Sequence, residues 1–150
     1  MPQIYSGVTP AVALSAGVAK TCAAMVSAAG DQIFLVELVV SFDGVTASAV
    51  PVTVDLCDYD VAAPGTRTTG TPVQMHGQRS AVASAFYHTY TVEPTVLLAS
   101  YRWYVTPNGG LLHLQFPLGR EPETVIAKGM AVRCNAPAAV NATVTMVWEE

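Results

Sequence analysis

The stretch from residue 32 to residue 60 carries the most regular alternation of hydrophobic and polar positions in the chain. Its first half places apolar side chains at every second position, on the face formed by Phe34, Val36, Leu38, Val40 and Phe42. Its second half repeats the pattern with Val52, Val54 and Leu56. A period of two is that of a β-strand with one buried face. Between the halves, Asp43-Gly44 is a strong turn dipeptide because glycine tolerates positive φ. We therefore predict a two-stranded ribbon.

The opposite face of the first predicted strand is also mostly apolar. It carries Ile33, Leu35, Glu37 and Val39. A face that meets only water normally alternates toward polar residues, so this one favours contact with another protein. These four residues are our first candidates for a subunit interface.

Three further segments are less regular. Residues 1–18 are small and polar with Gly7, Pro10 and Gly17, and we expect an extended N-terminal arm. Residues 20–29 are rich in alanine, which favours a helix, but the segment is short and Gly30-Asp31 leads directly into a strand. Of these two alternatives we predict a strand. Residues 61–78 are rich in Gly, Pro and Thr without periodicity, and we predict a long hairpin-like loop that projects from the sheet.

The rest of the chain alternates again. Strands are predicted at residues 81–92, 95–105, 111–116, 123–134 and 139–149. Asn108-Gly109 is the clearest hairpin turn among the connections. A total of about eight short strands with turn signals between them is typical of a β-sandwich or jelly roll. We expect an all-β fold with residues 19–150 as a single domain behind the arm.

Two features of these strands suggest contacts with partners. Tyr101, Trp103 and Tyr104 place aromatic side chains on both faces of one strand, and aromatic residues anchor many interfaces. The alternative is that they fill the core of the sandwich. Glu37 and Arg102 each interrupt an apolar face, and a buried charge needs a partner. We hypothesise that they pair across the sheet or across a subunit boundary.

Composition narrows the classes of function. Apolar residues make up 51% of the 150 residues and charged residues only 12%, which favours a folded domain and is compatible with a surface that a partner covers. The net charge of −4 with seven scattered basic residues argues against nucleic-acid binding. The longest apolar run, residues 33–40, is far shorter than the ~20 residues of a spanning helix, and the N-terminus lacks a basic signal region.

Candidate chemistry is sparse. Cys22, Cys57 and Cys134 are far apart and lie in apolar segments, which predicts buried, inert thiols. The three histidines have no second ligand at metal-binding spacing, and no nucleophile motif occurs. Asp55, Asp58 and Asp60 permit a calcium site, but we interpret them as solvating a strand end. We expect no enzyme, no cofactor and no metal.

Four segments resemble a known family. They are residues 14–21 (LSA…AKT), 40–45 (VSFDGV), 116–120 (FPLGR) and 135–150 (NAPAAVN…VWEE). They are similar to small virion proteins of tailed bacteriophages and prophages, especially those of actinobacteria, and within these to capsid decoration proteins. The resemblance implies a β-sandwich that trimerises on the exterior of the capsid, bridges neighbouring major capsid subunits and has no catalytic residues. It also implies assembly in the host cytoplasm.

The residue patterns and this resemblance together give two expected sets of contact residues. The candidate subunit interface consists of Ile33, Leu35, Glu37, Val39, Arg102, Trp103 and Tyr104. The candidate capsid contact consists of Ile4, Tyr5, Val8, Arg67 and Gln74. The alternative function is a trimeric module of a head fibre or tail that binds a receptor or glycan, which exposed aromatic residues in a shallow groove would favour. Neither function involves nucleic acid or a membrane.

Overall fold

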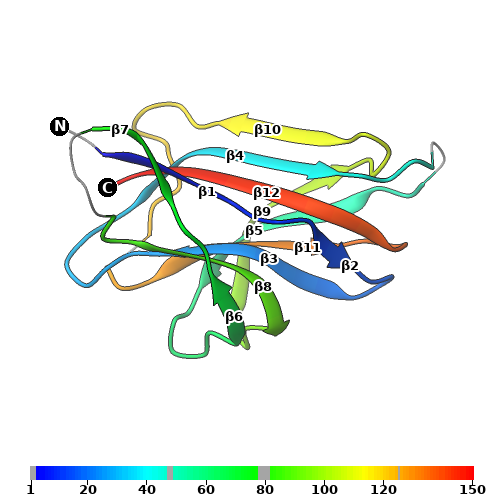
Figure 1. Ribbon diagram of the computed structural model, residues 1–150, viewed down its shortest axis with the longest axis horizontal. Helices are drawn as coiled ribbons and strands as arrows, with labels where there is room; N and C mark the ends of the chain where they lie inside the picture. Colours follow the sequence, from blue (N-terminus) through cyan, green and yellow to red (C-terminus); the bar gives the residue numbers. More distant parts are fainter. Residues whose placement is uncertain (1–2, 47–48, 78–81, 125) are drawn as a thin grey trace.

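The computed structural model describes residues 3–46, 49–77, 82–124 and 126–150, and these residues form a β-sandwich (Figure 1). The strands within them are β1 Ile4–Val8, β2 Val12–Leu14, β3 Ala19–Val26, β4 Phe34–Phe42, β5 Val52–Tyr59, β6 Thr66–Thr69, β7 Val73–His76, β8 Ala85–Val92, β9 Leu97–Val105, β10 Leu111–Gln115, β11 Gly129–Asn135 and β12 Val140–Glu149. The predicted all-β sandwich is confirmed. The described residues contain twelve strands rather than about eight, because the N-terminal segment and the loop after β5 also form strands.

Two six-stranded antiparallel sheets stack as the two layers of the sandwich (Figure 1). Sheet A has the strand order β10-β4-β12-β1-β7, and β2 also pairs with β12. Sheet B has the order β6-β8-β3-β11-β5-β9. The two chain ends lie at the same end of the sandwich, where Gln3 and Glu150 exchange both backbone hydrogen bonds.

Most connections cross from one sheet to the other, and two predicted hairpins are therefore wrong. The strands of the predicted ribbon, β4 and β5, lie in opposite sheets and face each other through the core. The Asn108-Gly109 turn also links opposite sheets, from β9 to β10. Its local geometry is as expected, with a φ of 62° at Gly109. A turn dipeptide reverses the chain, but it does not decide which strand becomes the hydrogen-bonded neighbour.

The core lies between the sheets and is filled by alternate residues of the strands. As predicted, Leu38, Val40 and Phe42 of β4 are buried, and so are Val52, Val54 and Leu56 of β5. Trp148 of β12 is fully buried, with its ring stacked on Phe86 at 6.1 Å between centroids. Its indole Nε1 donates to Ser84 Oγ at 2.7 Å, so the polar atom of this large side chain is satisfied.

A β-bulge in β4 corrects the predicted faces of that strand. The register against β12 shifts between Val147, opposite Glu37, and Trp148, opposite Leu35, so Val36 is an extra residue. The bulge reverses the alternation, and Ile33 and Leu35 are fully buried while Phe34 and Val36 are only half-buried. Ile33 and Leu35 belong to the core, and their predicted place on an outer interface is wrong.

The N-terminal segment is part of the sandwich. β1 pairs with β12 on one side and with β7 on the other, and β2 pairs with β12. Tyr5 is 2% exposed and packs against Trp148 at 6.2 Å between ring centroids. The predicted separate arm is therefore wrong from residue 4 onward, because alternate residues of β1 and β2 fill the core; residues 1 and 2 lie outside the described part.

The loop at residues 61–78 also differs from the prediction. It contains β6, which pairs with β8 at one edge of sheet B, and β7, which pairs with β1 at one edge of sheet A. The segment therefore spans two sheet edges, and Figure 1 shows it along the side of the sandwich. Gln78 lies outside the described residues. The predicted strand at residues 20–29 is confirmed as far as Val26, where β3 ends, and β3 pairs with both β8 and β11.

Candidate interaction surfaces

The outer face of sheet A brings together residues from both predicted contact sets. Cross-strand registers place His113, Val39, Thr145 and Val8 in one row and Gln115, Glu37, Val147 and Ser6 in the next. We call this surface the sheet A face; it comprises Ile4, Ser6, Val8, Glu37, Val39, Ser41, Leu111, His113, Gln115, Thr143, Thr145 and Val147. Val8 and Leu111 expose 58% and 62% of their surface. The sheet A face is rich in valine and threonine and poor in charge.

Glu37 is a carboxylate of the sheet A face, and the hydrogen-bond partners of its side chain lie in the same sheet. His113 Nε2 lies 3.0 Å from Glu37 Oε1, and Gln115 Nε2 donates to Glu37 Oε2 at 3.3 Å. Arg102 lies in sheet B and is bound to Asp55 instead. The hypothesis that Glu37 and Arg102 pair within one sheet is therefore wrong.

Asp55 lies in a row of charges on the outer face of sheet B. Arg102 on β9 and Arg133 on β11 are its direct cross-strand neighbours. Arg102 donates Nε to Asp55 Oδ1 at 2.7 Å and Nη2 to Oδ2 at 2.9 Å, and Arg133 Nη2 donates to Oδ2 at 3.1 Å. The hydrogen bond from Arg102 is the main reason that the pKa of Asp55 is lowered, in spite of burial. The interpretation of Asp55 as a solvated strand-end carboxylate is wrong.

The aromatic residues of β9 divide between two surfaces. Tyr101 and Trp103 lie on the inner face of sheet B, opposite the core residues Leu56 and Val54. Their rings are stacked at 5.6 Å between centroids, and Trp103 packs against the core. Tyr101 also lies 6.3 Å from the ring of Phe116, so these side chains close the gap between β9 and β10 at one side of the sandwich. Tyr104 is 71% exposed on the outer face of sheet B. The core interpretation therefore holds for Trp103, and the interface contact of Tyr104 stays a prediction.

The predicted capsid-contact residues do not form one patch. Ile4 and Val8 lie on the sheet A face, whereas Tyr5 is buried, so its predicted surface contact is wrong. Arg67 lies over the ring of Tyr87 at 3.7 Å and donates to the Tyr59 hydroxyl, on the outer side of sheet B. Gln74 on β7 donates to the side-chain oxygen of Gln3 at 3.0 Å.

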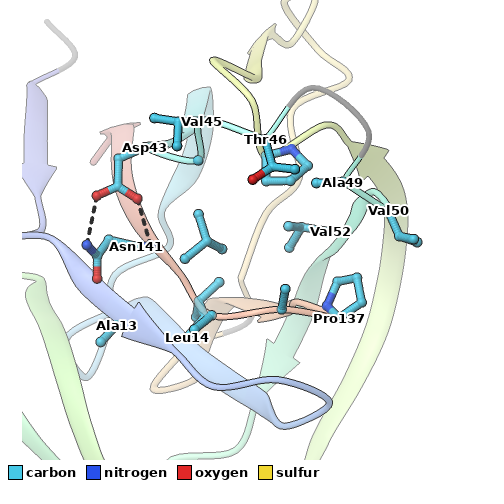
Figure 2. A pocket seen from close by; sticks show the side chains of 15 residues that line it. Ala13, Leu14, Asp43, Val45, Thr46, Ala49, Val50, Val52, Pro137 and Asn141 are labelled. Atoms are coloured by element: carbon cyan, nitrogen blue, oxygen red, sulfur yellow. Dashed lines mark hydrogen bonds between the residues drawn. The ribbon is translucent and has the colours of Figure 1, made fainter.

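A pocket of about 580 Å³ (Figure 2) lies at the loop end of the sandwich, opposite the end that holds the C-terminus in Figure 1. Its walls are mainly small apolar side chains, and among them are Leu14, Val52 and Pro137. Asp43 accepts hydrogen bonds from the backbone N and side-chain Nδ2 of Asn141, at 2.9 and 2.7 Å, and these bonds lower the pKa of its carboxyl group. Figure 2 shows both bonds at the rim, where they join the end of β4 to the start of β12.

Other candidate chemistry is limited in the described residues. The three cysteines are free and buried, as predicted, and burial raises the pKa of Cys57 to about 11. In the part of the chain that the structure describes, no three His, Cys, Asp or Glu side chains gather where they could hold a metal ion. Over the same residues, no helix has the length and hydrophobicity to cross a membrane.

Comparisons with known proteins do not assign the chain to a family. No protein-family model matches the chain, and neither does any curated protein. One solved structure, titled "Structure of infectious bursal disease virus Gx strain", is similar with a TM-score of 0.28 and 10% sequence identity. The similarity covers 99% of this chain and 42% of that one, so this chain spans less than half the length of its neighbour. A similarity this weak does not establish a shared fold or function.

Proposed function

We propose that this protein is a structural component of a virus particle, a capsid decoration protein of a tailed bacteriophage. It binds the outer surface of the head as a homotrimer and stabilises the lattice of the major capsid protein. The sheet A face is the observation that supports this role best. Large exposed valine and leucine side chains on a surface poor in charge are typical of surfaces that partners cover.

The sheet A face has two halves that suit two kinds of contact. Val39 on β4 and Leu111 on β10 form the half that we assign to contacts between subunits. Ile4 and Val8 on β1 form the half that we assign to the capsid. Each subunit of the trimer would bind its own site on the lattice, so the affinity of the trimer would exceed that of a single weak contact. A protein that binds only the assembled lattice stabilises it by mass action.

The test is binding of the purified protein to phage heads that lack it, with Val8→Lys as the disruptive variant. Val8 is 58% exposed on the sheet A face, and Val92 is 56% exposed on β8 of sheet B. Val92→Lys is therefore a matched control. We expect Val8→Lys to weaken the affinity for the heads by about tenfold, or about 1.4 kcal/mol, because its charge must be desolvated on binding. Occupancy at protein concentrations below saturation then falls.

The readout is the copy number per head, counted by quantitative mass spectrometry and located by cryo-electron microscopy. Equal occupancy of the two lysine variants would refute the assignment of the sheet A face. Absence of the unmodified protein from the heads of particles that encode it would refute the decoration role itself.

A further inference from the structure

The charged row Arg102–Asp55–Arg133 contains two positive charges and one negative charge. The Asp55 side chain is only 5% exposed, and a buried carboxylate requires a cation. Arg102 alone meets that requirement, because it donates one hydrogen bond to each oxygen of the Asp55 carboxylate. Arg133 then adds a second guanidinium to the same carboxylate. The row carries a net charge of about +1 on a chain whose net charge is −4.

The surplus charge comes with unused hydrogen-bond donors. A guanidinium has five N–H groups. Within the described residues, Arg102 uses its Nε and Nη2 groups on Asp55, and Arg133 uses its Nη2 group. Both arginines line a recess of about 310 Å³, together with Thr53 and Asn135. The Arg102 side chain is 53% exposed, so a ligand can reach it from solvent.

The row ends at a free sheet edge. β9 is the outermost strand of sheet B, and along its nine residues only one side pairs with a described strand, β5. Such an edge presents unpaired backbone N–H and C=O groups, and extended peptides bind by pairing with them. Leu98 and Tyr104 on this strand are 67% and 71% exposed. Side chains of β9 are therefore accessible, and they combine large apolar groups with the charge of Arg102.

We propose that an extended segment of a partner protein pairs with the β9 edge and places an aspartate or glutamate carboxylate on Arg102, while Arg133 continues to neutralise Asp55 from the other side. Adjacent strands lie about 4.8 Å apart, and directly opposite residues project from the same face. A residue opposite Arg102 therefore presents its side chain to the free donors of that guanidinium. The position two residues away on the segment lies over Tyr104 and suits an apolar side chain.

Charge complementarity selects a partner segment over a second copy of β9. The sequence of β9 is LLASYRWYV, which contains no acidic residue. Two copies of β9 paired edge to edge would bring two cationic rows together without supplying a carboxylate. This site lies on sheet B, so the inference stands apart from the assignment of the sheet A face to the capsid.

The test is a titration of the full-length, ¹⁵N-labelled protein with short blocked peptides, followed by NMR. One peptide alternates threonine and valine around a central glutamate, and its match has glutamine there. We expect the glutamate peptide to shift the amide signals of β9 and to bind about tenfold more tightly than the glutamine peptide. Arg102→Gln should remove that difference. Arg120→Gln, which loses the same charge in an exposed loop, should preserve it.

Further arms separate the alternatives. If Arg102→Gln does not fold, as judged by its amide spectrum, Arg133→Gln takes its place, since Asp55 then keeps both hydrogen bonds from Arg102. Equal affinity for the two peptides, or an equal loss in Arg120→Gln, overturns the proposal. Glucuronate or inorganic phosphate that binds as tightly as the glutamate peptide also overturns it, because the recess would then be a simple anion site.

Discussion

Asp55 is the charged side chain on which the outer face of sheet B depends. It is almost fully buried, yet it remains ionised because two arginines on neighbouring strands surround it. Its three hydrogen bonds also tie β5 to β9 and to β11, two strands that are distant from it in sequence. Loss of the carboxylate would therefore leave both arginines without their partner and weaken three strands at once.

We expect Asp55→Asn to lower the free energy of unfolding by about 2 kcal/mol, a value reduced from that of a fully buried pair because Arg102 is half exposed. Arg102 holds the folded-state pKa of Asp55 below its ordinary value of 3.8. The stabilisation is therefore complete above that value and is lost as the pH falls through the folded-state pKa. Urea denaturation over a pH series measures both effects. Asp31→Asn, at an exposed turn, is the control; an equal effect there would contradict the prediction.

The cysteine thiols are a second test at the scale of single residues. Cys22, Cys57 and Cys134 are fully buried. Burial raises the pKa of Cys57 to about 11, and the hydrogen bond with Cys22 together with burial raises that of Cys134. Because the thiolate is the reactive form, we expect no labelling by a thiol reagent in the native protein at pH 7 and labelling of all three residues in denaturant. Rapid labelling of the native protein would contradict their burial.

At the scale of elements, β1 and β2 are structural strands of sheet A. Tyr5, Val12 and Leu14 each expose 3% or less of their surface and belong to the main core. β1 also connects β12 to β7, so its removal would expose the edge of β12 and leave β7 unpaired. Residues 4–14, which the sequence predicts to be part of a separate arm, therefore contribute to the core of the domain.

Deletion of residues 1–17 is therefore expected to unfold the domain, because it removes three core side chains, each with a typical cost of about 2–5 kcal/mol. This differs from the expectation from the sequence, in which residues 1–18 are an extended arm outside a domain formed by residues 19–150. Circular dichroism and thermal unfolding of the truncated protein test it. A cooperative transition near that of the full chain would show that β1 and β2 are dispensable.

At the scale of the whole molecule, the two sheets have different outer faces. The outer face of sheet A exposes Val8 and Leu111 and has few charged side chains. Sheet B carries the charged row at Asp55 and a small satellite cluster around Tyr59 and Tyr90. The proposed assembly uses the first face for its larger contacts and leaves the β9 edge of sheet B available for a further partner.

We expect Val39→Lys to dissociate the proposed trimer, because a lysine at the subunit contact must be desolvated. Native mass spectrometry should then show a shift from three times 15.7 kDa to a single 15.7 kDa chain. Glu37→Gln is the control, since both partners of Glu37 lie in sheet A and its shape is preserved. A monomeric unmodified protein would refute the trimer, and dissociation by Glu37→Gln would return that carboxylate to the subunit boundary.

The sequence by itself determined what depends on neighbouring residues. The period of two in residues 34–60 and 97–105 predicts strands, and Gly109 has the positive φ that its Asn-Gly turn requires. Cysteine burial and the all-β class also follow, since apolar alternation and low charge leave few other ways to bury these side chains. These features depend on neighbouring residues in the sequence and not on which strands pair.

Only the tertiary structure decided the pairing and the faces. β4 and β5 are close in sequence but lie in opposite sheets, where β4 pairs with β10 and β12, and β5 pairs with β9 and β11. The extra residue Val36 reverses the faces of one strand, and no local pattern marks a bulge that exists only against β12. Asp55 acquires its arginines from positions 47 and 78 residues away. Contacts between distant segments depend on how whole surfaces pack, which a local alternation of residues does not encode.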